Sequence, residues 1–107
     1  HVRHDQISDS ELNSVIRRFE EQKNPALSLF IAKKYYAQGS YEEAYNYALE
    51  TNKLNPNIED SVLIFSQSLV KLGKREEAIT TLKAYLDRSN STEATSLLDK
   101  IEKGKFK

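Results

Sequence analysis

The chain contains no cysteine, no methionine and no tryptophan, and it has only three glycines and two prolines in 107 residues. The absence of cysteine excludes disulfide bonds, thiolate metal ligands and a cysteine nucleophile. The absence of methionine leads us to expect a piece cut or processed from a longer protein. The three glycines all fall where a helix is expected to end, so the chain has no glycine-rich loop to hold a phosphate.

Charge of one sign and long apolar runs are also missing. Sixteen basic and sixteen acidic residues give a formal net charge of zero, which argues against nucleic acid as the main partner. The longest apolar runs, such as 29–32 and 62–65, are far shorter than the ~20 residues of a membrane span. We expect no membrane contact from this fragment, and we expect it to be a cytoplasmic or periplasmic part of a larger protein.

Apolar residues recur at helical spacing along the chain, and no segment alternates with a period of two, so we predict an all-α fold. Two serine–glutamate pairs, Ser8 with Glu11 and Ser40 with Glu43, have the spacing of a capping box at a helix start. The predicted organisation is a flexible terminus over 1–7, a flanking helix over 8–24, two helix–turn–helix units over 25–58 and 59–92, and a capping helix with a tail over 93–107.

The two central units share a short motif. Gly39–Ala44 reads GSYEEA and Gly73–Ala78 reads GKREEA, and the two copies begin 34 residues apart. Glycine suits the reversal between paired helices, the glutamates suit the positive start of the second helix, and alanine lets two helices approach closely. Self-similarity at a fixed period of this length is typical of a solenoid.

This unit resembles the tetratricopeptide repeat, whose 34 residues form a helix–turn–helix. The first unit meets the family pattern at Ile31, Ala32, Tyr35, Gly39, Tyr41, Ala44 and Pro56, and the second at Phe65, Ser66, Leu69, Gly73, Ala78, Leu82 and Tyr85. Departures from the pattern stand at Ser28, Ala48, Thr51 and Asn90. The resemblance covers 25–92 and implies a right-handed α–α superhelix of two units with a flanking helix at each end.

In that family the first helix of each unit lines a concave groove that holds a segment of a partner protein. The resemblance therefore implies a groove lined by Leu29, Lys33 and Tyr36 from the first unit and by Leu63, Gln67 and Val70 from the second. Some members hold a terminal carboxylate with lysines and asparagines, but here Leu29 takes the place of the first lysine and Lys33 that of an asparagine. We expect an apolar or amphipathic partner segment instead.

Two alternatives remain open for this apolar lining. The helix over 8–24 would bury it by folding across the groove. Otherwise the chain is a structural homo-oligomerisation module, with the groove or the end helices pairing two copies. We expect a monomer or a weak homodimer.

No set of residues indicates an enzyme, a cofactor site or a metal site. His1 and His4 have helical spacing, but only Asp5 lies nearby, whereas a metal needs three or four converging ligands. The acidic pairs, such as Glu42-Glu43, are explained by solvated faces and helix starts. We expect the tail 103–107 to be a frayed, solvated end.

The wider role is a hypothesis based on analogy with other repeat proteins. A methionine-free fragment rich in lysine, asparagine and tyrosine resembles the soluble part of a larger bacterial protein. We expect an assembly component of a multi-protein machine, such as a secretion, pilus or DNA-uptake system of the envelope.

Overall fold

The computed structural model describes the backbone of residues 2–107 and the side chains of residues 10–107. Over that range the chain folds into helices only, which confirms the all-α helical repeat predicted from the sequence. The six helices over residues 2–107 are α1 (Val2–Gln22), α2 (Pro25–Ala37), α3 (Tyr41–Leu54), α4 (Glu59–Lys71), α5 (Arg75–Leu86) and α6 (Thr92–Glu102).

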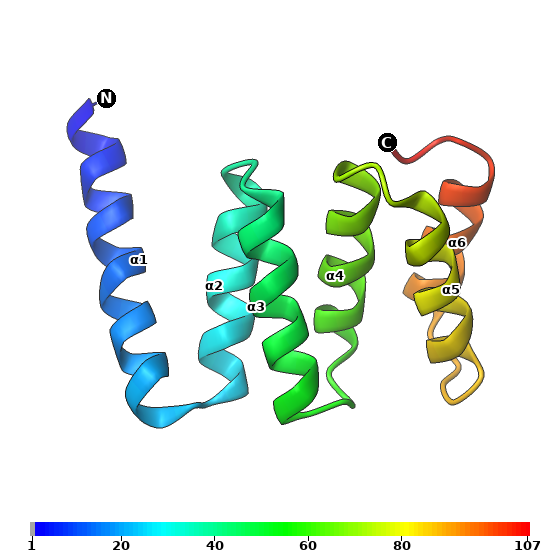
Figure 1. The fold of residues 1–107 in the computed structure, drawn as a ribbon, viewed down its shortest axis with the longest axis horizontal. Coiled ribbons are helices and arrows are strands. Elements are labelled where there is room, and N and C mark those ends of the chain that lie inside the picture. The colour runs from blue at the N-terminus through cyan, green and yellow to red at the C-terminus, as the bar shows by residue number, and fades with distance from the viewer. Residues whose placement is uncertain (1) are drawn as a thin grey trace.

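The helices follow one another along the long axis of a 40 × 30 × 20 Å body (Figure 1). Each helix packs against its neighbours in the chain, and α2, α4 and α6 also approach one another as an inner layer. The remaining helices, α1, α3 and α5, form an outer layer. Within the described residues their backbones stay apart from one another, although the Phe19 ring of α1 packs edge-on against the Tyr47 ring of α3. This arrangement places the first helix of each predicted unit in the inner layer.

The same turn ends all three inner helices. Gly39, Gly73 and Gly104 have φ angles of 81°, 81° and 72°, a left-handed conformation that glycine adopts without the strain of a side chain. After α2, the Gly39 N–H donates to the Tyr36 carbonyl at 3.0 Å, and the next N–H donates to the Tyr35 carbonyl at 2.9 Å. The same pair of bonds follows α4 and α6, so each turn is a Schellman motif.

The start of the chain differs from the prediction. We predicted a flexible segment over 1–7 and a helix beginning at Ser8, but α1 begins at Val2 and continues through Ser8 without a break. His1 lies outside the described residues. No proline or glycine stands between Val2 and Lys23 to stop a helix, so a helix anchored by Leu12 and Phe19 extends outward past the predicted cap.

The capping groups also differ from the prediction. Ser40 is the N-cap residue of α3 as expected, but its side chain makes no cap hydrogen bond. Side chains cap two other helices instead. At α2 the side-chain oxygen Oδ1 of Asn24 accepts from the Ala26 N–H at 2.8 Å, and at α6 Ser91 Oγ accepts from the Ala94 N–H at 2.9 Å. Each cap satisfies an N–H group that the helix itself leaves unpaired.

The core has two clusters, one at each end of the stack. Leu12 and Phe19 of α1 pack with Ile31 of α2 in the first. The second joins α4, α5 and α6 and contains Val62, Leu69, Ala78, Ile79, Leu82, Tyr85, Ala94, Leu97 and Ile101. Between the two, the rings of Tyr45 and Phe65 stack with centroids 4.7 Å apart, which connects α3 of the first unit to α4 of the second.

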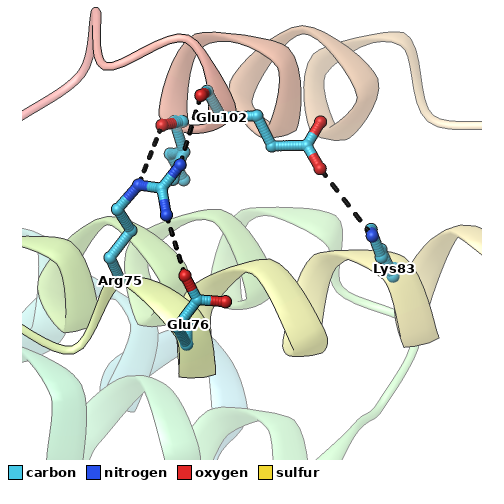
Figure 2. A network of polar contacts seen from close by, with 5 residues as sticks. Arg75, Glu76, Lys83 and Glu102 are labelled. Carbon is cyan, nitrogen blue, oxygen red and sulfur yellow. Dashed lines mark hydrogen bonds and ion pairs between the residues drawn. The ribbon is translucent and has the colours of Figure 1, made fainter.

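Arg75, the first residue of α5, fixes the end of α6 (Figure 2). Its Nε donates to the Ile101 carbonyl at 3.3 Å and its Nη2 to the Glu102 carbonyl at 3.2 Å, while Nη1 pairs with Glu76 at 2.8 Å. Lys83 lies 3.7 Å from the Glu102 carboxylate. A cation at the last carbonyls of a helix satisfies their free acceptors and opposes the negative end of the dipole.

Candidate functional site

The six residues predicted to line the groove all lie on the inner helices. Leu29, Lys33 and Tyr36 are on α2, and Leu63, Gln67 and Val70 are on α4. Lys33 is exposed and the other five are half-buried, in contrast to fully buried neighbours on the same helices such as Ala32 and Ser66. The structure therefore places the six residues on the surface of the inner layer.

On the α2 side, two of these residues are already engaged with other groups. Lys33 Nζ lies 2.9 Å from Asp60 Oδ2 of α4, and the two side chains are 49% and 51% exposed. Because the pair is half in solvent, it contributes little to stability, but it fixes Lys33 across the gap between the two inner helices.

Tyr36 packs edge-on against Tyr41, with ring centroids 5.3 Å apart. Burial raises the pKa of Tyr36 above its ordinary value, and the neighbouring Tyr41 raises it further. The hydroxyl of Tyr36 is therefore neutral at physiological pH, and the ring presents an uncharged surface at the end of α2.

On the α4 side, the inner layer encloses a trough between α4 and α6. Leu63 and Gln67 line one wall, and Leu97 and Lys100 line the other, in a cavity of about 480 Å³. Phe106 also lines this cavity. Leu63, Val70 and Phe106 are half-buried and pack against the core cluster of α4, α5 and α6.

Phe106 was missed by the sequence analysis, which predicted that 103–107 is a frayed end. Instead, Phe106 is half-buried, and Lys71 Nζ lies 5.2 Å from the centroid of its ring. The same ammonium lies 5.9 Å from the Tyr41 ring, so Lys71 lies near both aromatic rings. A signal for this was present, since Gly104-Lys105-Phe106 repeats the register of Gly39-Ser40-Tyr41.

The first helix lies away from these residues. Among the described helices, the backbone of α1 approaches only that of α2. Its Leu12 and Phe19 pack with Ile31, and the Phe19 ring also packs edge-on against Tyr47 of α3, with ring centroids 6.1 Å apart. None of the six predicted groove residues belongs to this cluster. In this structure α1 therefore extends the outer layer, rather than folding across the groove as one of our alternatives required.

The structure also bears on metal binding and on membrane crossing for the part of the chain that it describes. No group of three or more His, Asp or Glu side chains is placed to hold a metal ion there, and the side chains of His1 and His4 lie outside that part. Within residues 2–107, no helix has both the length and the apolar character needed to cross a membrane.

Comparison with known proteins gives one match. No curated protein and no solved structure matches the chain. Residues 17–85, more than half of the chain, match the family described as anaphase-promoting complex, cyclosome, subunit 3, a family of tetratricopeptide-like repeats. The match begins inside α1 and ends inside α5, so it contains α2, α3 and α4 and most of α5. The chain belongs to this repeat family.

Proposed function

We propose that the protein is a non-enzymatic scaffold that holds an apolar or amphipathic segment of a partner protein along its inner layer. Repeats of this class are protein-interaction modules. The binding surface that we propose consists of Leu29, Lys33, Tyr36, Leu63, Gln67 and Val70, together with the trough between α4 and α6.

The observation that carries this proposal is the docking of Phe106. An aromatic residue from the non-helical segment after α6 already lies in the trough, half-buried against the α4 side. The position of Phe106 supports an aromatic or apolar side chain as the kind of group that this surface binds. Beyond Phe106 the trough is open along Leu63 and Gln67, and Leu29 and Tyr36 continue the half-buried surface onto α2.

The partner segment is expected to be apolar on one side and weakly charged. Lys33 is engaged by Asp60, so it does not act as an isolated cation for a partner carboxylate. A half-buried surface of Leu, Tyr and Val gains most from removing further apolar area from water, at about 25 cal/mol per Å².

A peptide selection tests the proposal. Random twelve-residue peptides displayed on phage are selected on the wild-type chain, and the enriched peptides are synthesised and titrated. The double variant Tyr36→Glu/Leu63→Glu places two charges on the proposed surface and should weaken these peptides by at least tenfold. The matched control Asn13→Glu/Asn46→Glu places two charges at exposed positions on α1 and α3 and should leave binding unchanged.

Circular dichroism and thermal melting of both double variants accompany the titrations. Peptides that bind the inner-layer variant as tightly as the wild type would contradict the proposed surface. Loss of helicity in that variant alone would show that Tyr36 and Leu63 belong to the core. The single variant Gln67→Glu, at a half-buried polar position in the trough, then provides the test without removing apolar packing.

Self-association is the alternative occupant of the same surface. Sedimentation equilibrium of the chain at high micromolar concentration distinguishes the two cases. A monomer or a weak dimer agrees with the scaffold, whereas a tight dimer that the inner-layer charges dissociate would identify a second copy as the occupant.

The proposal extends to a role as an assembly component of a larger complex. The description of the matched family as a subunit of a complex supports this role. The bacterial envelope setting, with its secretion, pilus or DNA-uptake machines, rests on composition and on analogy with other repeat proteins. Proximity labelling with the tagged protein in its native cell tests the setting, and neighbours confined to another compartment would exclude it.

A further inference from the structure

The tail, residues 103–107, takes a different path from the segments that follow the other two inner helices. After α2 and α4 the Schellman turn leads the chain into the outer-layer helices α3 and α5, whereas after α6 the same turn leads it back toward α4 (Figure 1). The N–H groups of Lys105 and Phe106 both donate to the Lys100 carbonyl, at 2.8 and 3.3 Å. The turn therefore directs Phe106 into the trough between α4 and α6.

Phe106 is the anchor of the tail. Its ring is half-buried in the trough and packs against the core cluster of α4, α5 and α6, whereas the other four residues of the tail are exposed. Lys71 of α4 supports the ring from the opposite wall, with its ammonium 5.2 Å from the ring centroid. One side chain thus holds the tail on the inner layer.

These contacts are weak enough to be reversed. A cation beside an aromatic ring attracts it only modestly at an exposed site, and Lys71 is exposed. The two backbone bonds share a single acceptor, the Lys100 carbonyl. A segment with so few buried contacts opens locally at a small cost in free energy, so the ring can leave the trough while the helices stay folded.

We propose that the tail is an autoinhibitory latch, in which Phe106 occupies the trough until an aromatic side chain of a partner protein takes its place. This inference rests on the proposed scaffold function, and it adds the anchoring residue of the partner and the regulation of the site.

The lining of the trough explains why the two rings compete. Besides Phe106, the apolar lining residues are Leu63 and Leu97, and the others are polar, namely Gln67, Thr92, Glu93, Ser96 and Lys100. A partner's ring finds the apolar side of the trough and the Lys71 ammonium only where Phe106 lies. Because the apparent affinity of a site falls with the fraction of molecules in which it is open, the docked tail weakens partner binding.

Fluorine NMR tests the displacement directly. The chain contains four phenylalanines, so labelling with 4-fluorophenylalanine gives four ¹⁹F signals, and the one that is missing from Phe106→Ala belongs to Phe106. The probe is N-acetyl-phenylalaninamide, a capped phenylalanine. Saturation with this probe should move the Phe106 signal toward its position in the urea-unfolded chain. Lys71→Gln should move the same signal in the same direction without the probe.

A titration of ¹⁵N-labelled chains measures the competition. The probe should shift the Gln67 and Leu97 amide signals and bind Phe106→Ala at least ~threefold tighter than the wild type. Leu54→Ala removes an exposed apolar side chain at the end of α3 and should leave the affinity unchanged. If Phe106→Ala lost helicity, Phe106→Leu, which keeps apolar packing but not the ring beside Lys71, should still bind the probe tighter than the wild type.

The opposite results overturn the latch. If the probe bound without moving the Phe106 signal, or bound Phe106→Ala no tighter than the wild type, Phe106 would be a fixed wall of the trough. Absence of probe binding to both chains would show that the trough takes no aromatic side chain. The scaffold is judged separately by the selected peptides, because peptides that bind wild type and Phe106→Ala alike but fail to bind Tyr36→Glu/Leu63→Glu would remove the latch and keep the scaffold.

Discussion

Ser28 Oγ and Thr51 Oγ1 lie 2.6 Å apart in the buried space between α2 and α3. Both residues depart from the repeat pattern, and the structure shows that the two departures compensate each other. Ser28 Oγ also lies 3.1 Å from the Pro25 carbonyl, and Thr51 Oγ1 lies 2.8 Å from the Tyr47 carbonyl. Each hydroxyl has one proton, so at most two of these three contacts are hydrogen bonds at any moment. When one hydroxyl donates to the other, it leaves its own carbonyl without that donor.

This pairing predicts energetic coupling between the two residues. Ser28→Ala and Thr51→Val each remove one hydroxyl and leave the other with fewer partners, so each should lower the free energy of unfolding by ~1 kcal/mol. The double variant should cost less than the sum by about 0.5–1.5 kcal/mol. Urea unfolding of the wild type and the three variants measures the coupling, and strictly additive costs would show that the two hydroxyls act independently.

Replacing Gly73 tests the turn between α4 and α5. A Cβ atom added at Gly73 meets no atom within 4 Å, so only the left-handed backbone opposes a side chain. Gly73→Ala should therefore cost about 1–2 kcal/mol, and Gly73→Asn less, because asparagine adopts this conformation more readily. Chemical denaturation provides the measurement, and an alanine variant as stable as the wild type would contradict the prediction.

Ala78 tests how tightly α5 packs on α4. The side chain is 0% exposed and belongs to the larger core cluster. Ala78→Leu forces extra methyl and methylene groups into this space, which should lower the free energy of unfolding by ~1–3 kcal/mol. Ala84→Leu on the same helix is exposed and should change the free energy of unfolding by no more than ~0.5 kcal/mol. If the two variants were equally stable, the space around Ala78 between α4 and α5 would be large enough for a leucine side chain.

Stability should fall at alkaline pH partly through Tyr47. Burial is the main cause that raises the pKa of Tyr47 above 10.0, and Tyr35, Glu20 and Glu50 raise it further. The folded state therefore holds this proton more tightly than the unfolded state. The resulting stabilisation is fully present below pH 10 and is lost as the pH rises through the folded pKa.

Tyr47→Phe removes this titration, so the variant should lose less stability than the wild type above about pH 10. The difference in free energy of unfolding between the two proteins should stay constant from pH 7 to about pH 9. Lysine deprotonation affects both proteins alike and cancels in the comparison. Parallel stability curves across the whole alkaline range would refute the role of Tyr47.

The repeat core follows from local signals in the sequence. The ends of α2 and α4 are marked by Gly39 and Gly73, and the start of α2 by Pro25, because each of these residues restricts or permits one backbone conformation. The six residues predicted to line a groove lie on α2 and α4, the first helix of each unit, which is where the family resemblance implied them. The predicted start of α1 at Ser8 was wrong. A capping pattern marks the start of a helix only where the residues before it cannot themselves be helical, and here they can.

Other features depend on contacts between units, which spacing along one helix does not reveal. The Lys33–Asp60 pair joins residues 27 positions apart. Lys71 Nζ lies near the rings of Tyr41 and Phe106, which follow two different turns. Phe106 would have been found by comparing its turn with Gly39-Ser40-Tyr41, where an aromatic residue stands at the same position.

The three matching turns have an electrostatic consequence. They bring the carboxyl ends of α2, α4 and α6 to one edge, where Lys34, Lys71 and Lys100 stand in the last turns. Immediately after the first two turns, α3 and α5 begin at the same edge with Glu42-Glu43 and Glu76-Glu77. Opposite dipole ends therefore alternate along this edge, but Lys74, Arg75, Lys103, Lys105 and Lys107 also stand in or beside the turns and leave an excess of positive charge. An acidic partner that approaches this edge should therefore associate faster at low ionic strength than at high ionic strength.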